Sequence, residues 1–150
     1  ARIPLAVKVG GLLGSPIHSA AEAGQQTIDL FKIIGTPVEN YPMDEQWLRS
    51  VGEESYRRAY DPAGKLRQQA ALLGSADRRK ALAKLKIPAL IIHGDADSMF
   101  RLAGGIATAK AIPGAKLVVL KGIGHGAFPR QVWPIMIDEI CEVIERGSEA

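Results

Sequence analysis

The stretch that decides the fold is IPALIIHGDAD, residues 87–97. A proline precedes a continuous apolar run over 89–93, and Gly94 ends it. A short apolar run between turn residues is typical of a strand that is covered on both faces, as in a parallel sheet. Two aspartates follow immediately. We therefore expect a buried parallel strand with a polar loop at its carboxyl end.

The residues that follow this strand alternate between helix and strand patterns. Gly104 to Ile112 predicts a modest helix, and Lys116 to Leu120 predicts a second short strand. A final amphipathic helix is indicated by an apolar stripe that consists of Trp133, Ile137, Ile140, Cys141 and Ile144. Strands that alternate with helices predict right-handed crossovers and an α/β architecture. Because sheets normally hold several strands, we expect further elements to flank these two.

The chain before residue 86 carries helical patterns with almost no strand signal. Helices are predicted over 20–34, 44–59, 61–73 and 76–85, the last of them basic and on the surface. Asp44 and the pair Asp61-Pro62 are helix-start signals. The expected apolar stripes are Ile28, Leu30, Phe31 and Ile34; then Trp47, Leu48, Val51, Ser55 and Ala59; then Leu66, Ala70 and Leu73. The segment Ile3 to Gly14 fits a short strand or a loop.

Composition narrows the class of protein. The 150 residues are 47% hydrophobic and 23% charged, which is typical of one globular domain or two small ones. The net charge of +3 is too small to indicate a nucleic-acid partner. A single cysteine excludes an internal disulfide framework and a multi-cysteine zinc site. No apolar run approaches the roughly 20 residues of a membrane-spanning helix.

The first residues are Ala-Arg-Ile-Pro rather than Met, and they do not resemble a signal peptide. We therefore expect a processed or truncated product whose true start lies further upstream.

Two loops carry the residues best suited to chemistry. Asp97 follows the first strand, and His125 follows the second within Gly122-Ile123-Gly124-His125-Gly126. Carboxyl ends of neighbouring parallel strands meet at one edge of a sheet, where ligands bind. An imidazole there could take a proton from a nucleophile while a carboxylate fixes its tautomer. We expect these two side chains to touch.

Together these residues resemble the C-terminal third of an α/β-hydrolase, closest to its esterase and methylesterase-like branch. The likeness lies in the segment 87–97, in Ala111-Ile112-Pro113-Gly114-Ala115-Lys116-Leu117 and in Gly122-Ile123-Gly124-His125. It implies a parallel sheet that a helical cap precedes, with residues 1–85 as cap and 86–150 as core segment. It also implies Asp97 as the acid and His125 as the base of a catalytic triad, with no metal or organic cofactor.

The chain departs from the family pattern in two places. Ser98-Met99-Phe100 stand after the acid, where the family has a proline and aliphatic residues. More importantly, no Gly-x-Ser-x-Gly elbow occurs, and Ser15 lacks the flanking glycines that such an elbow requires. The resemblance therefore implies that the nucleophilic serine comes from outside this chain, either from a missing N-terminal half or from another copy.

Several other residues have simpler interpretations. His93 is expected to be a satisfied strand-end histidine, and Asp95 is expected to make turn hydrogen bonds. A metal site formed by His93, Asp95 and Asp97 lacks a defined fourth ligand. His18 fits a cap or loop residue. The glycines of 10–14 do not match a dinucleotide-binding motif, so hydride transfer and phosphate binding are distant alternatives.

The candidate substrate-binding residues are Trp47, Met99 and Phe100. For Trp47, as for Met43, Tyr56 and Tyr60, packing within the cap is the favoured interpretation. Cys141 is expected to be a small buried hydrophobe, and Arg78-Arg79-Lys80 to be a solvated helix face.

Two functions are consistent with this sequence. The first is hydrolysis of a small-molecule carboxylic ester, with no nucleic-acid or membrane partner, by the complete enzyme. The alternative is a non-catalytic binding or scaffold module whose exposed sheet edge pairs with a partner strand.

Overall fold

The computed structural model describes residues 16–148, so the predictions for Ile3 to Gly14 and for Ser15 fall outside the described residues. Four helices come first: α2 (Ala20–Ile34), α3 (Glu45–Arg58), α4 (Pro62–Leu73) and the short α5 (Arg79–Leu82). They are followed by β1 (Leu90–Gly94), α6 (Leu102–Ala111), β2 (Lys116–Leu120), the 3-10 turn η1 (Arg130–Val132) and α7 (Trp133–Ser148).

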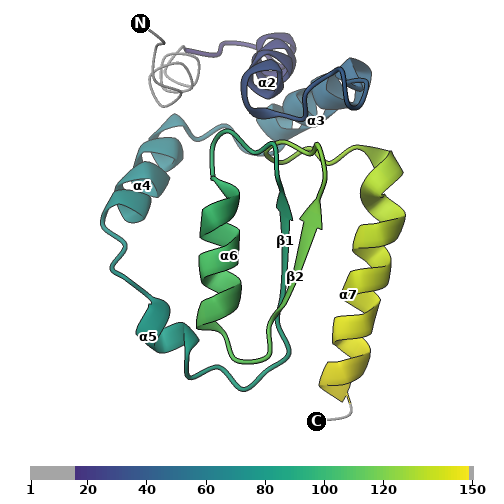
Figure 1. Ribbon diagram of the computed structural model, residues 1–150. Coiled ribbons are helices and arrows are strands. Elements are labelled where there is room, and N and C mark those ends of the chain that lie inside the picture. The colour runs from purple at the N-terminus through teal and green to yellow at the C-terminus, as the bar shows by residue number, and fades with distance from the viewer. Residues whose placement is uncertain (1–15, 149–150) are drawn as a thin grey trace, which may run out of the picture.

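The sheet is a parallel pair in which Leu90 lies opposite Lys116 and Gly94 lies opposite Leu120. Helix α6 connects the two strands, and α6 and α7 lie to either side of them (Figure 1). The expected strand–helix–strand–helix order is thus confirmed. A buried cluster of Leu120, Ile123 and Val132 joins the end of β2 to the start of α7.

The first three helices begin where short acceptor side chains satisfy free amides. Ser19 accepts a hydrogen bond from Glu22, Asp44 from Trp47, and Asp61 from Gly64. Pro62 occupies the first turn of α4, where its missing N–H costs nothing. The helix starts expected at Asp44 and at Asp61-Pro62 are confirmed.

Helices α2 and α3 pack closely together beyond the carboxyl ends of the strands (Figure 1). Their backbones approach at two glycines, because a Cβ on Gly52 would lie 2.9 Å from the Cα of Gly24. Helix α2 buries Ile28 and Ile34, as its periodicity predicts.

The stripe expected on α3 is confirmed at Leu48 and wrong at its later positions. The residues that α3 buries are Leu48 and Gly52, whereas Val51, Ser55 and Ala59 are exposed. The physical reason is the close glycine contact with α2, which turns the Leu48–Gly52 edge of α3 inward. Leu66 of α4 is likewise 68% exposed.

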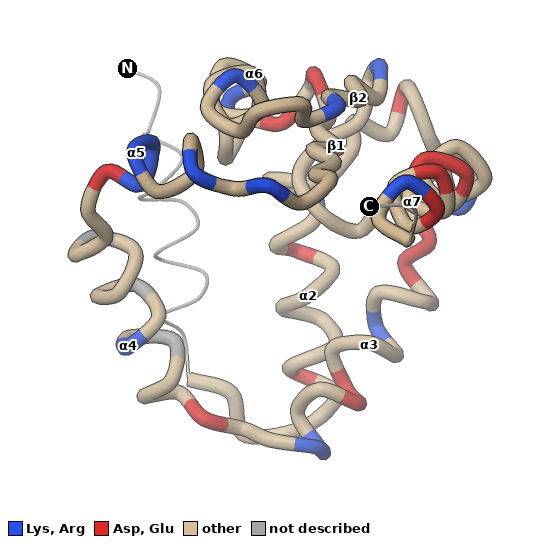
Figure 2. The backbone as a smooth tube through the Cα atoms, turned by 90° about the horizontal axis from the view of Figure 1, so that it is seen from below, with Lys and Arg blue, Asp and Glu red and all other residues tan. Residues whose placement is uncertain are grey.

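The helix expected over 76–85 shrinks to the four residues of α5, which contacts α6. Its basic residues, which are blue in Figure 2, are exposed, as expected. Its N-cap residue, Arg78, makes no side-chain cap, and the amide of Arg79 donates instead to Asp77 Oδ1 at 3.0 Å.

Helix α7 forms where it was expected, but the burial expected for its stripe is wrong. Met136 of α7 packs against the buried cluster that includes Val132 of η1, while Ile137, Ile140, Cys141 and Ile144 of α7 are exposed. Two strands cover only part of its apolar arc. Most residues of both strands are only half-buried. The expectation that the first strand is covered on both faces is therefore not met within the described residues.

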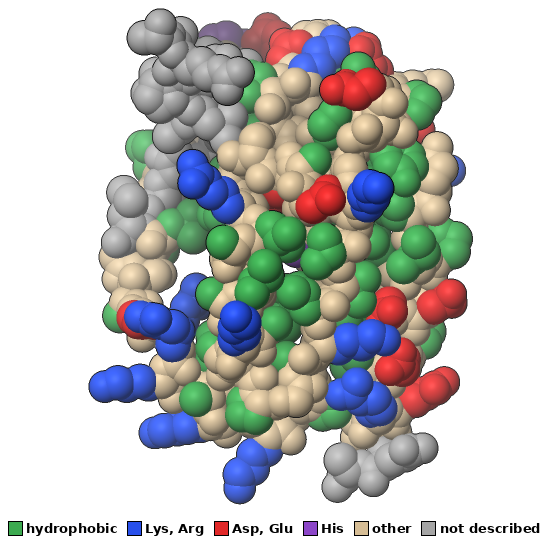
Figure 3. Space-filling view, viewed as in Figure 1, with side chains coloured by type: hydrophobic (Ala, Val, Ile, Leu, Met, Phe, Trp, Pro, Cys, Tyr) green, Lys and Arg blue, Asp and Glu red, His purple; other side chains and the backbone are tan. Residues whose placement is uncertain are grey.

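Hydrophobic side chains gather over the middle of the face seen in Figure 3, above the two strands. Lys and Arg gather at its lower left, and Asp and Glu on α7 at its right. Among residues 16–148, no helix is both long and apolar enough to cross a membrane.

Candidate active site

The loops that follow β1 and β2 are joined to each other by hydrogen bonds. The amide of Asp95 donates to Leu120 O at 3.1 Å, and the amide of Ala96 donates to Ile123 O at 3.0 Å. The carboxylate of Asp95 accepts a 2.6 Å hydrogen bond from the amide of Gly122. The turn role expected for Asp95 is confirmed, and the two loops form one structural unit.

Gly94 allows the two loops to approach this closely. A Cβ at Gly94 would lie 2.1 Å from Ile123 O, a distance that real side chains do not reach. Any larger residue there would push the loops apart.

The end of α2 holds the loop that carries His125. The amide of His125 donates to Ile34 O at 2.8 Å, and the amide of Gly124 donates to Thr36 Oγ1 at 3.1 Å. A Cβ at Gly124 would lie 2.0 Å from Gly35 O. The helical segment and the strand end are therefore in direct backbone contact beside the histidine.

Asp97 and His125 touch, as the sequence predicted. Asp97 Oδ2 lies 2.9 Å from His125 Nδ1, and the Asp97 side chain is only 8% exposed. The other oxygen, Oδ1, accepts hydrogen bonds of 2.8 Å from the amides of Met99 and Phe100. No residue of the described chain engages His125 Nε2, which leaves that nitrogen free to exchange a proton.

The net effect of these contacts is a pKa of Asp97 below its ordinary value. Burial alone raises this pKa, but hydrogen bonds from the Phe100 amide, the His125 ring and the Met99 amide outweigh it. The carboxylate is therefore ionised at neutral pH, the state needed to hold an imidazolium.

His93 supports the same loop from the strand. Its Nε2 lies 2.8 Å from Phe100 O and 4.0 Å from Asp97 Oδ2, and its side chain is mostly buried. This agrees with the interpretation as a satisfied strand-end histidine. The ring packs over Gly105 of α6, where a Cβ would lie 2.9 Å from His93 Nδ1.

The structure separates the candidate substrate-binding residues. The ring of Phe100 lies 5.2 Å from that of His125, and both Met99 and Phe100 are exposed beside the pair. Trp47 lies in the helical segment on the wall of a cavity. Tyr56 and Tyr60 pack against each other at 4.9 Å, which fits packing within this segment. His18 is exposed in the loop before α2.

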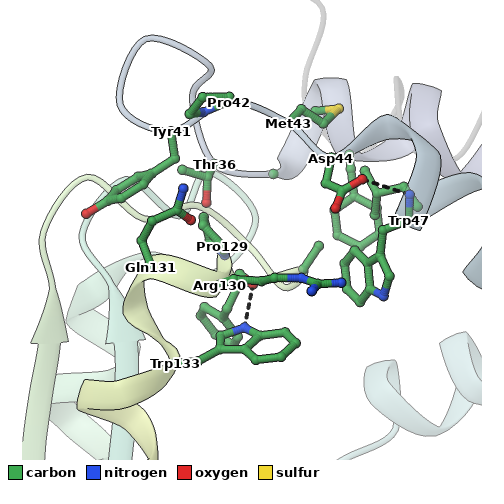
Figure 4. A pocket seen from close by; sticks show the side chains of 15 residues that line it. Thr36, Tyr41, Pro42, Met43, Asp44, Trp47, Pro129, Arg130, Gln131 and Trp133 are labelled. Atoms are coloured by element: carbon green, nitrogen blue, oxygen red, sulfur yellow. Dashed lines mark hydrogen bonds between the residues drawn. The ribbon is translucent and has the colours of Figure 1, made fainter.

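The cavity next to the His125 loop was not anticipated. It has a volume of about 150 Å³ and lies between the α2–α3 segment and the residues after Gly126 (Figure 4). Met43 and Trp47 line one side, and Phe128, Arg130 and Trp133 line the other. The run of aromatic, proline and arginine residues directly after His125 was the available signal. Within residues 16–148 no group of three His, Cys, Asp or Glu side chains could hold a metal ion.

Comparisons with known proteins place this geometry in a family. Residues 67–133 match the family model described as TAP-like protein, one of the α/β-hydrolase models. Over 120 residues the chain is 32% identical to a pimeloyl-[acyl-carrier protein] methyl ester esterase of Xanthomonas campestris pv. campestris, covering 80% of this chain and 45% of the relative. Together these matches support an α/β-hydrolase family member.

Solved structures of α/β-hydrolases share the fold of the chain. An esterase from Rhodococcus sp. ECU1013 superposes with a TM-score of 0.62 at 20% identity, covering 93% of this chain and 47% of that one. An esterase from Exiguobacterium antarcticum gives a TM-score of 0.58 at 20% identity over 91% and 47%. The two strands are thus the C-terminal part of an α/β-hydrolase sheet, which a helical segment precedes. The chain spans about half the length of these relatives.

Proposed function

We propose that this α/β-hydrolase chain supplies the acid and the base of a carboxylic ester hydrolase. The supporting observation is the contact between Asp97 and His125, made by a buried carboxylate whose second oxygen is held by two amides. The curated relative named above is a methyl ester esterase, which favours an ester as the small-molecule substrate.

In the proposed reaction a serine hydroxyl attacks the ester carbonyl carbon while its proton passes to His125 Nε2. Asp97 stabilises the imidazolium through Nδ1 and keeps the ring in the required tautomer. His125 then gives the proton to the departing alcohol. Water, activated by the same nitrogen, hydrolyses the acyl-enzyme. These steps need no metal or organic cofactor.

We propose that the nucleophile lies outside the 150 residues. The printed sequence contains no Gly-x-Ser-x-Gly, and the chain covers 45% of the curated relative. Each of the two strands has one unpaired edge within the described residues, which is consistent with further strands supplied by another segment. The exposed Ile137, Ile140 and Ile144 of α7 would be covered by a further layer.

We further propose that residues 1–85 act as the cap and 86–150 as the core segment. Helices α2 and α3 lie beyond the carboxyl ends of the strands, where a cap can exclude water from the reaction. Met99 and Phe100 would border the substrate next to His125, and Trp47 would contact it from the cap.

The test uses the open reading frame that contains Ala1, expressed in full. We expect it to hydrolyse a nitrophenyl ester and to be labelled by a fluorophosphonate at a serine outside residues 1–150. His125→Ala should abolish turnover, and His18→Ala, an exposed control, should leave it unchanged. Turnover that survives His125→Ala would refute the proposal.

The exposed apolar face of α7 also favours the alternative of a binding or scaffold module. In that case the chain should be folded, monodisperse and inert toward esters, and no upstream serine should be labelled. The same assays therefore separate the two functions.

A further inference from the structure

The cavity beside the His125 loop is built from aromatic side chains. Its walls include Phe31, Tyr41, Trp47, Phe128 and Trp133, and neither Asp97 nor His125 lines it. A volume of about 150 Å³ is enough for a single benzene-sized ring. Ring faces and edges on several sides favour an aromatic occupant over a branched aliphatic one.

One cation borders this cavity without an acidic partner. The guanidinium of Arg130 lies 5.6 Å from the ring centre of Trp133, and the side chain runs toward Trp47 (Figure 4). No carboxylate of the described residues lies within ion-pair distance of Arg130. The indole of Trp133 is itself fixed, since its Nε1 donates to Phe128 O at 2.9 Å.

The acidic residue at the cavity is already engaged. Asp44 Oδ1 accepts a 2.9 Å hydrogen bond from the amide of Trp47 and thereby caps α3. The positive end of the α3 dipole offsets part of its charge. Arg130 is therefore the group better able to recruit a charged ligand, and that ligand is an anion.

We propose that this cavity binds a one-ring aromatic carboxylate. The ring enters between Trp47 and Trp133, and the carboxylate pairs with the Arg130 guanidinium at the mouth, the geometry that guanidinium groups favour. Binding there requires no nucleophile, so it can be measured whether or not the chain takes part in the proposed hydrolysis.

The chain carries its own reporter for this site. It has two tryptophans, and both Trp47 and Trp133 line the cavity. Titration of the 150-residue chain with phenylacetate should change tryptophan emission in a saturable way, with a Kd on the order of 1 mM for so small a ligand. Phenylacetamide, the neutral analogue, should bind about tenfold more weakly because it lacks the charge.

Two matched variants test whether the charge of Arg130 itself is needed to bind the carboxylate. Arg130→Gln should weaken phenylacetate about tenfold and remove the preference over phenylacetamide, whereas Arg58→Gln, exposed at the end of α3, should change neither. Trp47→Phe keeps an aromatic wall and leaves Trp133 as the single reporter, so saturation should persist. An absence of saturable change, equal binding of acid and amide, or tighter binding of benzylamine would each overturn the proposal.

Discussion

Replacing Asp97 tests how the acid loop is held together. Its carboxylate accepts two amide hydrogen bonds of 2.8 Å and contacts His125 Nδ1 at 2.9 Å. Hydrogen bonds to an ionised group contribute about 1.5 kcal/mol or more each, so three sum to about 4.5 kcal/mol. Because water can reach part of this exposed loop, we expect Asp97→Ala to lower the free energy of unfolding by about 3 kcal/mol.

Asp97→Asn keeps the size of the side chain and one acceptor oxygen but removes the negative charge. The amide oxygen of Asn can still accept from Met99 and Phe100, so the loss of stability should be about 1 kcal/mol. Its NH2 group would instead face His125 Nδ1 and favour the tautomer protonated at Nε2, which cannot act as base. In the complete enzyme we therefore expect turnover to fall by about 10⁴-fold, as for a triad of this type.

Urea unfolding followed by tryptophan emission measures these changes. Asp138→Ala, on the exposed face of α7, is the control and should stay within about 0.5 kcal/mol of the parent chain. Equal midpoints for Asp97→Ala and Asp97→Asn, both close to the parent, would refute the account of the loop.

The Asp97 carboxylate also makes the free energy of unfolding depend on pH. The folded-state pKa of Asp97 lies below the ordinary value of 3.8, so its charged form stabilises the fold above that pH. This contribution is lost as the pH falls through the lower, folded-state pKa. The stability difference between the parent chain and Asp97→Asn should thus be constant near neutral pH and shrink below about pH 4. A difference that grows on acidification would contradict the direction of the shift.

Three further substitutions test the fold around the site. Gly94→Ala should cost about 3 kcal/mol in urea unfolding, because its Cβ would lie 2.1 Å from Ile123 O. Gly104→Ala is its matched control, because no atom lies within 4 Å of the added Cβ. At this helical position alanine should raise the free energy of unfolding by up to about 1 kcal/mol, and a decrease would contradict the argument. Asp44→Ala should remove the α3 cap and cost about 1 kcal/mol by the same measurement; an unchanged midpoint would show that the cap is dispensable.

Local patterns predicted the elements well where the signal is short-range. The apolar run before Gly94 and the caps at Asp44 and Asp61 depend on residues within one turn or one strand. The contact between Asp97 and His125 was also predictable, because parallel strands bring their carboxyl ends to one edge. Their catalytic roles stay a prediction.

Burial was predicted less well, because it depends on neighbours that the pattern does not name. The glycine contact between α2 and α3 rotates α3, so Val51 faces solvent and Gly52 does not. Cys141 lies on an apolar stripe, yet two strands are too narrow to cover it.

The cavity is lined by segments from both halves of the chain, so the aromatic, proline and arginine residues after His125 could not by themselves locate it. The hold of α2 on the His125 amide likewise joins residues about ninety positions apart. The sequence by itself determined the order of the strands and main helices and which two side chains share a sheet edge, because those follow from periodicity and chain direction. Only the tertiary structure decided which helix faces are covered and where a ring-sized space remains, because both arise from the fit of distant surfaces.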